Sequence, residues 1–185
     1  MIRSGRSVVF GVTIACIFST GCSGWVTGGG GPVYSADGNQ GRTGGAVSVD
    51  GVLTPKPHTV FNHGNSPLPV AYHNGFEGIF TPDQKSFGWQ TGLALYWLPR
   101  PVSGFLVVGT DLHVDEIDGF FSFGNFQPYA QIGLVTSLGE GKHAPIFTLT
   151  AQGEYFVNYL TYLHDNEPKT DTFLTLKFGF GFELQ

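Results

Sequence analysis

The sequence predicts an all-β protein, an antiparallel up-and-down β-barrel with eight strands. Three observations support this prediction. Apolar and polar residues alternate with a period of two through most of residues 86–184, which is typical of strands with two different faces. Clusters of Pro, Gly, Asn and Asp interrupt the alternation where hairpin turns are needed. Glycine is abundant (28 of 185 residues) and few residues are charged (12%), which argues against a helical bundle.

Charge and aromatic content exclude two further classes of protein. The formal net charge is −5, and no cluster of Lys and Arg is present, so we expect no nucleic-acid partner. Aromatic residues make up 15% of the chain, which argues against general disorder.

The expected strands are the alternating segments, and neighbours joined by short connections should pair antiparallel. The most regular segment is 174–184, where Leu and Phe alternate with Thr, Lys, Gly and Glu. We favour eight strands in total, although the pattern before residue 86 leaves the first strands open. The expected strands cover residues 44–54, 70–81, 86–98, 106–114, 125–138, 146–160 and 174–184.

Residues 1–21 are expected to be a secretory signal peptide. Arg3 and Arg6 form a positive n-region, and residues 8–18 form an apolar h-region that is too short to span a bilayer as a helix. Both cysteines, Cys16 and Cys22, lie in or at the end of this signal. The mature chain is therefore expected to have no disulfide and no thiolate metal site.

The run Ser19-Thr20-Gly21-Cys22 resembles the lipobox of bacterial lipoproteins, in which the cysteine becomes the lipidated first residue of the mature chain. The two residues before Cys22 are small, as in that motif, whereas Ser19 stands where the family prefers Leu, Val or Ile. The resemblance implies a lipid on Cys22. The alternative is an ordinary signal peptide that is cleaved near Gly21 or Ser23.

Glycine-rich residues 22–42 are expected to be a flexible tether between the signal and a barrel domain at 43–185. Four consecutive glycines followed by Pro32 are typical of linkers. No Lys-Ser/Thr follows them, so a phosphate-binding loop is not expected.

A period of two does not by itself say which strand face points inward. The polar faces hold Gly, Ala, Gln, Asn, Thr and Tyr rather than the Lys and Glu of a water-facing strand, and such residues suit a narrow barrel interior. Trp89 and Trp97 lie near the two ends of one apolar face, roughly 19 Å apart along the membrane normal for a strand tilted by about 45°. We therefore expect the apolar faces to meet lipid, with Trp89 and Trp97 in an aromatic girdle.

Residues 43–185 resemble small eight-stranded bacterial outer-membrane β-barrel proteins in their alternation, strand length and secretory signal. The resemblance implies a location in the outer membrane after transfer across the inner membrane, with membrane lipid and the barrel-assembly machinery as partners. In that class the final strand often ends in Phe or Trp, which assists insertion. Here Phe182 and Leu184 keep the alternation, and Gln185 departs from the pattern.

Polar residues on the inward faces are expected to form an interior polar network, because groups inside a narrow barrel must pair to offset desolvation. The alternative is an acid–base set built on Asp111, His113 and Asp115, as a lipid-modifying enzyme would need. No G-x-S-x-G motif accompanies it, so we expect no enzyme and no cofactor. The expected network comprises Asp111, His113, Gln131, Gln152, Glu154 and Lys177.

No metal site is expected from the spacing of the possible ligands. His58, His63 and His73 have no carboxylate or Cys at a confirming distance, and residues 55–69 form a Pro-rich expected loop. Asp83, Lys85 and the acidic segment 115–118 are interpreted as solvated turns.

The sequence favours an outer-membrane β-barrel with a structural or envelope-associated role and an interior too narrow for a general pore. One alternative is a soluble lipocalin-like lipoprotein that binds an apolar ligand inside its barrel. The other is a lipid-modifying enzyme centred near His113.

Overall fold

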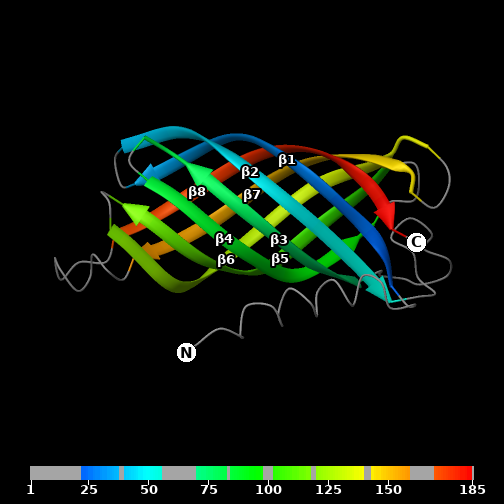
Figure 1. Ribbon diagram of the computed structural model, residues 1–185, viewed down its shortest axis with the longest axis horizontal. Coiled ribbons are helices and arrows are strands. Elements are labelled where there is room, and N and C mark those ends of the chain that lie inside the picture. The colour runs from blue at the N-terminus through cyan, green and yellow to red at the C-terminus, as the bar shows by residue number, and fades with distance from the viewer. Residues whose placement is uncertain are drawn as a thin grey trace, which may run out of the picture.

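The strands close into a single barrel in the computed structural model of the chain. The structure describes residues 22–37, 40–55, 70–82, 84–97, 102–117, 120–139, 143–158 and 169–184. Each strand pairs antiparallel with the next, and β1 pairs with β8, so the predicted eight-stranded antiparallel barrel is confirmed (Figure 1). The strands are β1 (Cys22–Asp37), β2 (Gln40–Pro55), β3 (Val70–Phe80), β4 (Gln84–Tyr96), β5 (Val102–Ile117), β6 (Phe120–Ser137), β7 (Pro145–Asn158) and β8 (Lys169–Leu184).

Strands supply all the regular structure that positions the site. Among the residues with described positions, no helix is long and apolar enough to cross a bilayer. β1 begins and β8 ends at the same end of the barrel, on the right in Figure 1. We call this the terminal end, and the other end the distal end.

The expected tether is wrong, because residues 22–37 form strand β1. Gly28 to Gly31 pair with β2 on one side, and most of the strand pairs with β8 on the other. The backbones of β1 and β8 approach each other closely at Gly29, where a Cβ would lie 2.6 Å from Gly179 Cα. The barrel therefore begins at Cys22, and β1 is the strand that the alternation did not locate.

The acidic turn expected at residues 115–118 is also wrong in part, since β5 continues to Ile117. Asp115 points inward, is 3% exposed and accepts a hydrogen bond from Gln84 Nε2 at 3.4 Å. Glu116 points outward and its Oε2 lies 3.3 Å from Lys85 Nζ. Asp83 and Asp118 lie outside the described residues.

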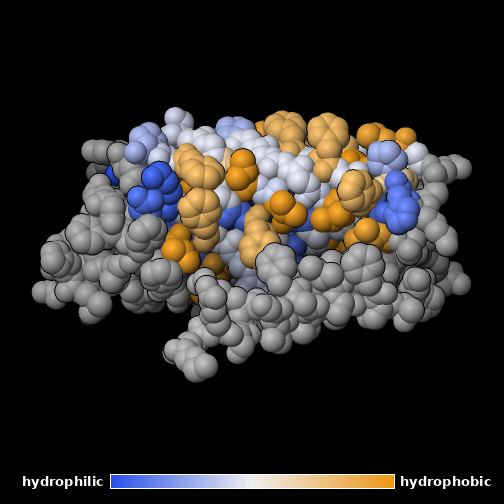
Figure 2. Space-filling view, in the orientation of Figure 1, coloured by the Kyte–Doolittle hydropathy of each residue, from blue (hydrophilic) through white to orange (hydrophobic). Residues whose placement is uncertain are grey.

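The apolar faces of the strands point outward, away from the barrel axis. On β8, Leu174, Phe178 and Phe180 are 54%, 45% and 65% exposed, whereas the intervening Thr175 and Lys177 are each 3% exposed. Figure 2 shows hydrophobic side chains gathered over the visible wall and the most hydrophilic ones toward its ends. A lipocalin-like barrel would place the apolar face inside, so the structure does not support that alternative.

Two pairs of polar side chains on the outer wall are hydrogen-bonded to each other. Trp89 Nε1 donates to Asn74 Oδ1 at 2.5 Å, and Tyr72 OH lies 2.6 Å from Thr91 Oγ1. Among the described strand residues, the charged side chains on this outer wall are those of the Lys85–Glu116 pair, near the distal ends of β4 and β5. Pairing of this kind is needed where a wall meets lipid, because an unpaired polar group costs several kcal/mol there.

Candidate functional site

The interior of the barrel holds a polar core between two apolar clusters. Toward the terminal end, Trp25 Nε1 donates to Tyr96 OH at 3.1 Å, and both rings lie 5.9 Å from Phe105 by their centroids. The second cluster comprises Val33, Ala46, Ile79 and Phe173, which are at most 4% exposed. The polar residues between these clusters are therefore shielded from both ends.

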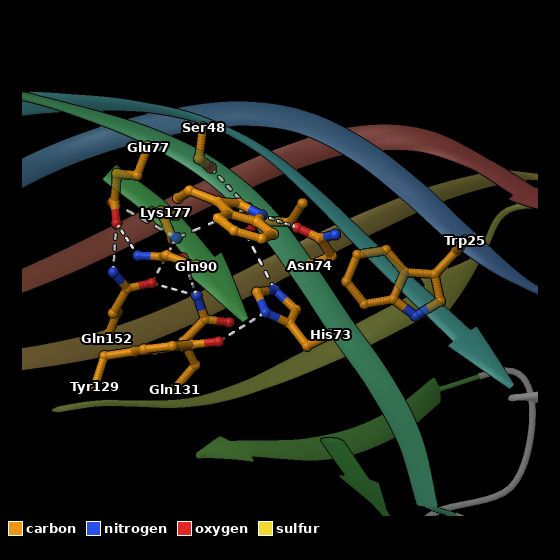
Figure 3. A network of polar contacts seen from close by, with 12 residues as sticks. Trp25, Ser48, His73, Asn74, Glu77, Gln90, Tyr129, Gln131, Gln152 and Lys177 are labelled. Atoms are coloured by element: carbon orange, nitrogen blue, oxygen red, sulfur yellow. Dashed lines mark hydrogen bonds and ion pairs between the residues drawn. The ribbon is translucent and has the colours of Figure 1, made fainter. Parts of the chain in front are cut away.

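Lys177 of β8 is the cation at the centre of this polar core (Figure 3). Its Nζ donates to Gln152 Oε1 at 2.6 Å and lies 3.6 Å from Glu77 Oε1 and 3.7 Å from Asp50 Oδ2. These partners come from β7, β3 and β2, so one ammonium group connects four strands. Its charge offsets the buried carboxylate of Glu77 and the partly buried carboxylate of Asp50, which loss of water contact alone would disfavour.

Two glutamine amides bridge the carboxylates of Glu77 and Glu154. Gln90 Nε2 donates to Glu77 Oε2 at 2.5 Å and to Glu154 Oε1 at 2.7 Å. Gln152 Nε2 donates to the same two oxygens. Gln131 Nε2 in turn donates to the amide oxygens of Gln90, at 3.3 Å, and of Gln152. Each amide thus contacts side chains from strands across the barrel.

A histidine connects the polar core to the apolar cluster at the terminal end, which includes Tyr129. His73 Nδ1 lies 2.8 Å from Tyr129 OH, and its Nε2 lies 3.3 Å from Asp50 Oδ1. Ser48 Oγ donates to the other oxygen of Asp50 at 2.7 Å. His73 therefore belongs to β3 and the barrel interior, whereas His58 and His63 lie outside the described residues.

A second histidine lies among acids further toward the distal end. His113 Nε2 lies 2.8 Å from Asp111 Oδ2 and 3.7 Å from Glu154 Oε2. On the other side of the ring, Nδ1 lies 2.6 Å from Ser86 Oγ. Glu154 joins this second cluster to the first, because its other oxygen accepts the amides of Gln90 and Gln152.

Ser86, His113 and Asp111 lie in the order of a hydrolase triad, but their burial argues against that chemistry. The three residues are 0%, 1% and 0% exposed. An acyl group must reach the serine oxygen for such a reaction, and Ser86 has no exposed surface in the described structure. The arrangement suits proton sharing or cation ligation inside a closed barrel.

The structure brings the six residues expected in the interior into two joined clusters. Gln131, Gln152, Glu154 and Lys177 lie in the first, whereas Asp111 and His113 lie in the second. Sequence reasoning missed their partners from β2, β3 and β4. The alternation could have located them, because they lie at the alternate positions of their strands that carry polar side chains. These partners are Ser48, Asp50, His73, Glu77, Ser86 and Gln90.

The other residues singled out from the sequence lie on the outer wall or at the start of β1. Trp89 and Trp97 point outward, and Trp97 is 47% exposed. Cys22 is the first residue of β1 and pairs with Pro55.

Comparisons with known proteins found likeness in fold. No protein-family model matches the chain, and no curated protein matches it. The crystal structure of Neisserial surface protein A (NspA) superposes with a TM-score of 0.65 at 11% identity, over 88% of this chain and 99% of that one. The crystal structure of Ail, the attachment invasion locus protein of Yersinia pestis, matches with a TM-score of 0.43 at 13% identity, over 89% of this chain and 99% of that one. The chain therefore shares the barrel fold of NspA.

Proposed function

We propose that this chain is an integral β-barrel of the bacterial outer membrane, with a structural or envelope-associated role and a sealed interior. One observation carries the proposal: the strand faces are inverted relative to a soluble barrel. Large apolar side chains cover the outer wall, while carboxylates, amides and a lysine fill the interior. Lipid is the solvent that this distribution suits, because contiguous apolar surfaces of this extent are rare on soluble monomers.

Closure of the barrel supports the same location. A strand that crosses hydrocarbon must pair its backbone groups on both sides, and only a closed sheet leaves no unpaired edge. Pairing of β1 with β8 meets this requirement. We expect Trp89, on the outer face of β4, and Trp97, which directly follows that strand, to contact the two interfacial regions of the bilayer.

The packing of the interior favours a structural role over transport. Trp25, Tyr96 and Phe105 fill the terminal end, and the polar core fills the middle. Ions and small solutes would have to displace these side chains. The name of NspA as a surface protein agrees with an envelope role for a barrel of this fold.

Export and anchoring complete the proposal. The positive and apolar segments of residues 1–21 direct transfer across the inner membrane, and the barrel-assembly machinery inserts the chain through its last strand. A lipid on Cys22 would sit at the terminal rim of the barrel, since β1 starts at that residue. There the acyl chains enter the same leaflet that the outer wall contacts.

Membrane fractionation tests the location. The full chain and its Cys22→Ser variant are produced in a Gram-negative host, and the membranes are washed with high salt and then with alkaline carbonate. We expect both proteins to stay in the outer-membrane pellet, because the barrel wall holds them there without an acyl chain. Release of Cys22→Ser into the soluble fraction would contradict an integral barrel and would indicate a lipid-anchored soluble one.

The same pair of proteins tests the lipid separately. Labelled palmitate should enter the parent chain and not the Cys22→Ser variant. Absence of label from the parent would show an ordinary signal peptide, and it would leave the fractionation result unaffected.

A further inference from the structure

Three side chains that commonly ligate metals converge inside the barrel. Asp111 and His113 extend from β5, and Glu154 extends from β7. One ligand atom from each lies within 4.8 Å of the others. The three residues are 0%, 1% and 2% exposed. Neighbouring donors around one small cation are separated by comparable distances, so an ion could contact all three with small side-chain movements.

When His113 carries its proton on Nδ1 alone, the carboxylate oxygens that face this cluster accept no hydrogen bond from the described residues, and Asp111 Oδ2 meets the lone pair of Nε2 at 2.8 Å. Both oxygens of Asp111 and Oε2 of Glu154 are buried and accept no hydrogen bond. Glu154 Oε1, by contrast, accepts the amides of Gln90 and Gln152. An unsatisfied buried carboxylate oxygen is costly, and the unsatisfied oxygens here are those directed at His113.

His113 is held in the orientation that a metal ligand needs. Its Nδ1 lies 2.6 Å from Ser86 Oγ. When Nδ1–H donates to that oxygen, Nε2 presents its lone pair toward the two acids, and a partner on the far nitrogen is the usual support of a ligating histidine. Gly88 leaves room for the Asp111 and His113 side chains, because a Cβ at that position would collide with Asp111 Oδ1 and lie 2.7 Å from His113 Cε1.

The charge of the cluster also favours a cation. Lys177 directs its ammonium group at Asp50 and Glu77, which form a different pair of carboxylates. The imidazole of His113 lies 2.8 Å from Asp111 and 3.7 Å from Glu154, while the charge of Lys177 also acts on Glu154. A divalent ion between them would balance both charges inside the barrel.

We propose that Asp111, His113 and Glu154 form a site for a divalent first-row transition metal. One imidazole nitrogen and two carboxylate oxygens are the donor set that Zn²⁺, Mn²⁺ and Fe²⁺ accept, whereas Ca²⁺ needs more oxygen ligands. The ion connects β5 to β7 across the intervening β6, and it enters while the barrel folds, because the closed barrel shields the site. The site does not depend on the location of the barrel in a membrane.

Refolding with and without metal tests the site. The full chain is unfolded in urea with a chelator, refolded into detergent micelles with Zn²⁺, passed through a desalting column and analysed for metal content. We expect about one Zn²⁺ ion per chain, as for a structural site that forms with the fold. We also expect the urea midpoint of the parent to rise with Zn²⁺ concentration, because the ion binds the folded state alone.

Matched variants locate the ion. Asp111→Asn and Glu154→Gln should lose both the stoichiometric Zn²⁺ and the dependence of the urea midpoint on Zn²⁺. Asp115→Asn changes the next inward acid of β5 and should keep both. Zn²⁺ content well below one ion per refolded parent chain would overturn the proposal, whether or not the variants fold. Equal Zn²⁺ content in the parent and Asp111→Asn would overturn it as well.

Discussion

Lys177→Met is expected to lower the free energy of unfolding of the barrel by about 3–5 kcal/mol, the usual cost of removing one partner from a buried ion pair. Methionine matches the length of the lysine stem but leaves the partly buried Asp50 and the buried Glu77 without the ammonium group that lies 3.7 and 3.6 Å away. Gln152 Oε1 also loses a hydrogen bond of 2.6 Å. Urea unfolding in lipid vesicles, followed by tryptophan fluorescence, measures the change.

Neutralising the acids provides the control for this prediction. Lys177→Met combined with Asp50→Asn and Glu77→Gln should unfold at higher urea than Lys177→Met alone, because no unpaired charge then remains. A single variant within about 0.5 kcal/mol of the parent would contradict a charge-compensating role, since changes of that size are typical of ordinary surface positions. A further loss of stability in the triple variant would indicate that Lys177 acts through packing.

Leu93→Lys should destabilise the barrel in lipid vesicles by about 2–4 kcal/mol, the cost of a lysine near the bilayer midplane. Leu93 is 55% exposed on the outer face of β4, midway between Trp89 and Trp97. The side chain would have to extend its ammonium group toward an interface or draw water into the hydrocarbon. Unfolding in urea, compared with the parent in the same vesicles, gives the difference.

Leu138→Lys is the matched control on the outer wall. Leu138 is 60% exposed and follows the last residue of β6, so its lysine reaches the interfacial region directly. Near an interface the cost should fall to about 0–1 kcal/mol. Equal and small effects at Leu93 and Leu138 would indicate that water, not lipid, surrounds the barrel.

The strand pattern predicted most of the fold because a barrel wall imposes opposite environments on successive side chains. The alternation is clearest in β8, where Leu174, Phe178 and Phe180 face outward around Lys177. β1 escaped prediction for a physical reason: glycine has no side chain, so Gly28 to Gly31 carry no alternation. Their place in the sheet depends on pairing with β2 and β8, which no local pattern reports.

The sequence predicts which residues of β5 to β8 belong to the interior site. It does not predict which side chains they contact. The alternation predicts that Gln152 and Glu154 point inward, but it does not indicate which residues they contact across the barrel. Gln152 contacts Glu77, 75 residues away, and Glu154 contacts Gln90, 64 residues away. Such contacts depend on the stagger of all eight strands, which closure of the barrel determines.

The position of Lys177 on the last strand has a consequence for assembly. Asp50 and Glu77 lie on β2 and β3, so their compensating cation is on the strand that closes the sheet onto β1. In the proposed membrane location, a barrel that lacks β8 would keep these acids without their counter-ion, next to hydrocarbon and with two open edges. Closure and charge neutralisation thus happen in one step. In partly assembled chains the charges of Asp50 and Glu77 are not compensated, which raises the free energy of these intermediates. We therefore expect insertion of the barrel to be cooperative and truncated products to be disfavoured in the membrane.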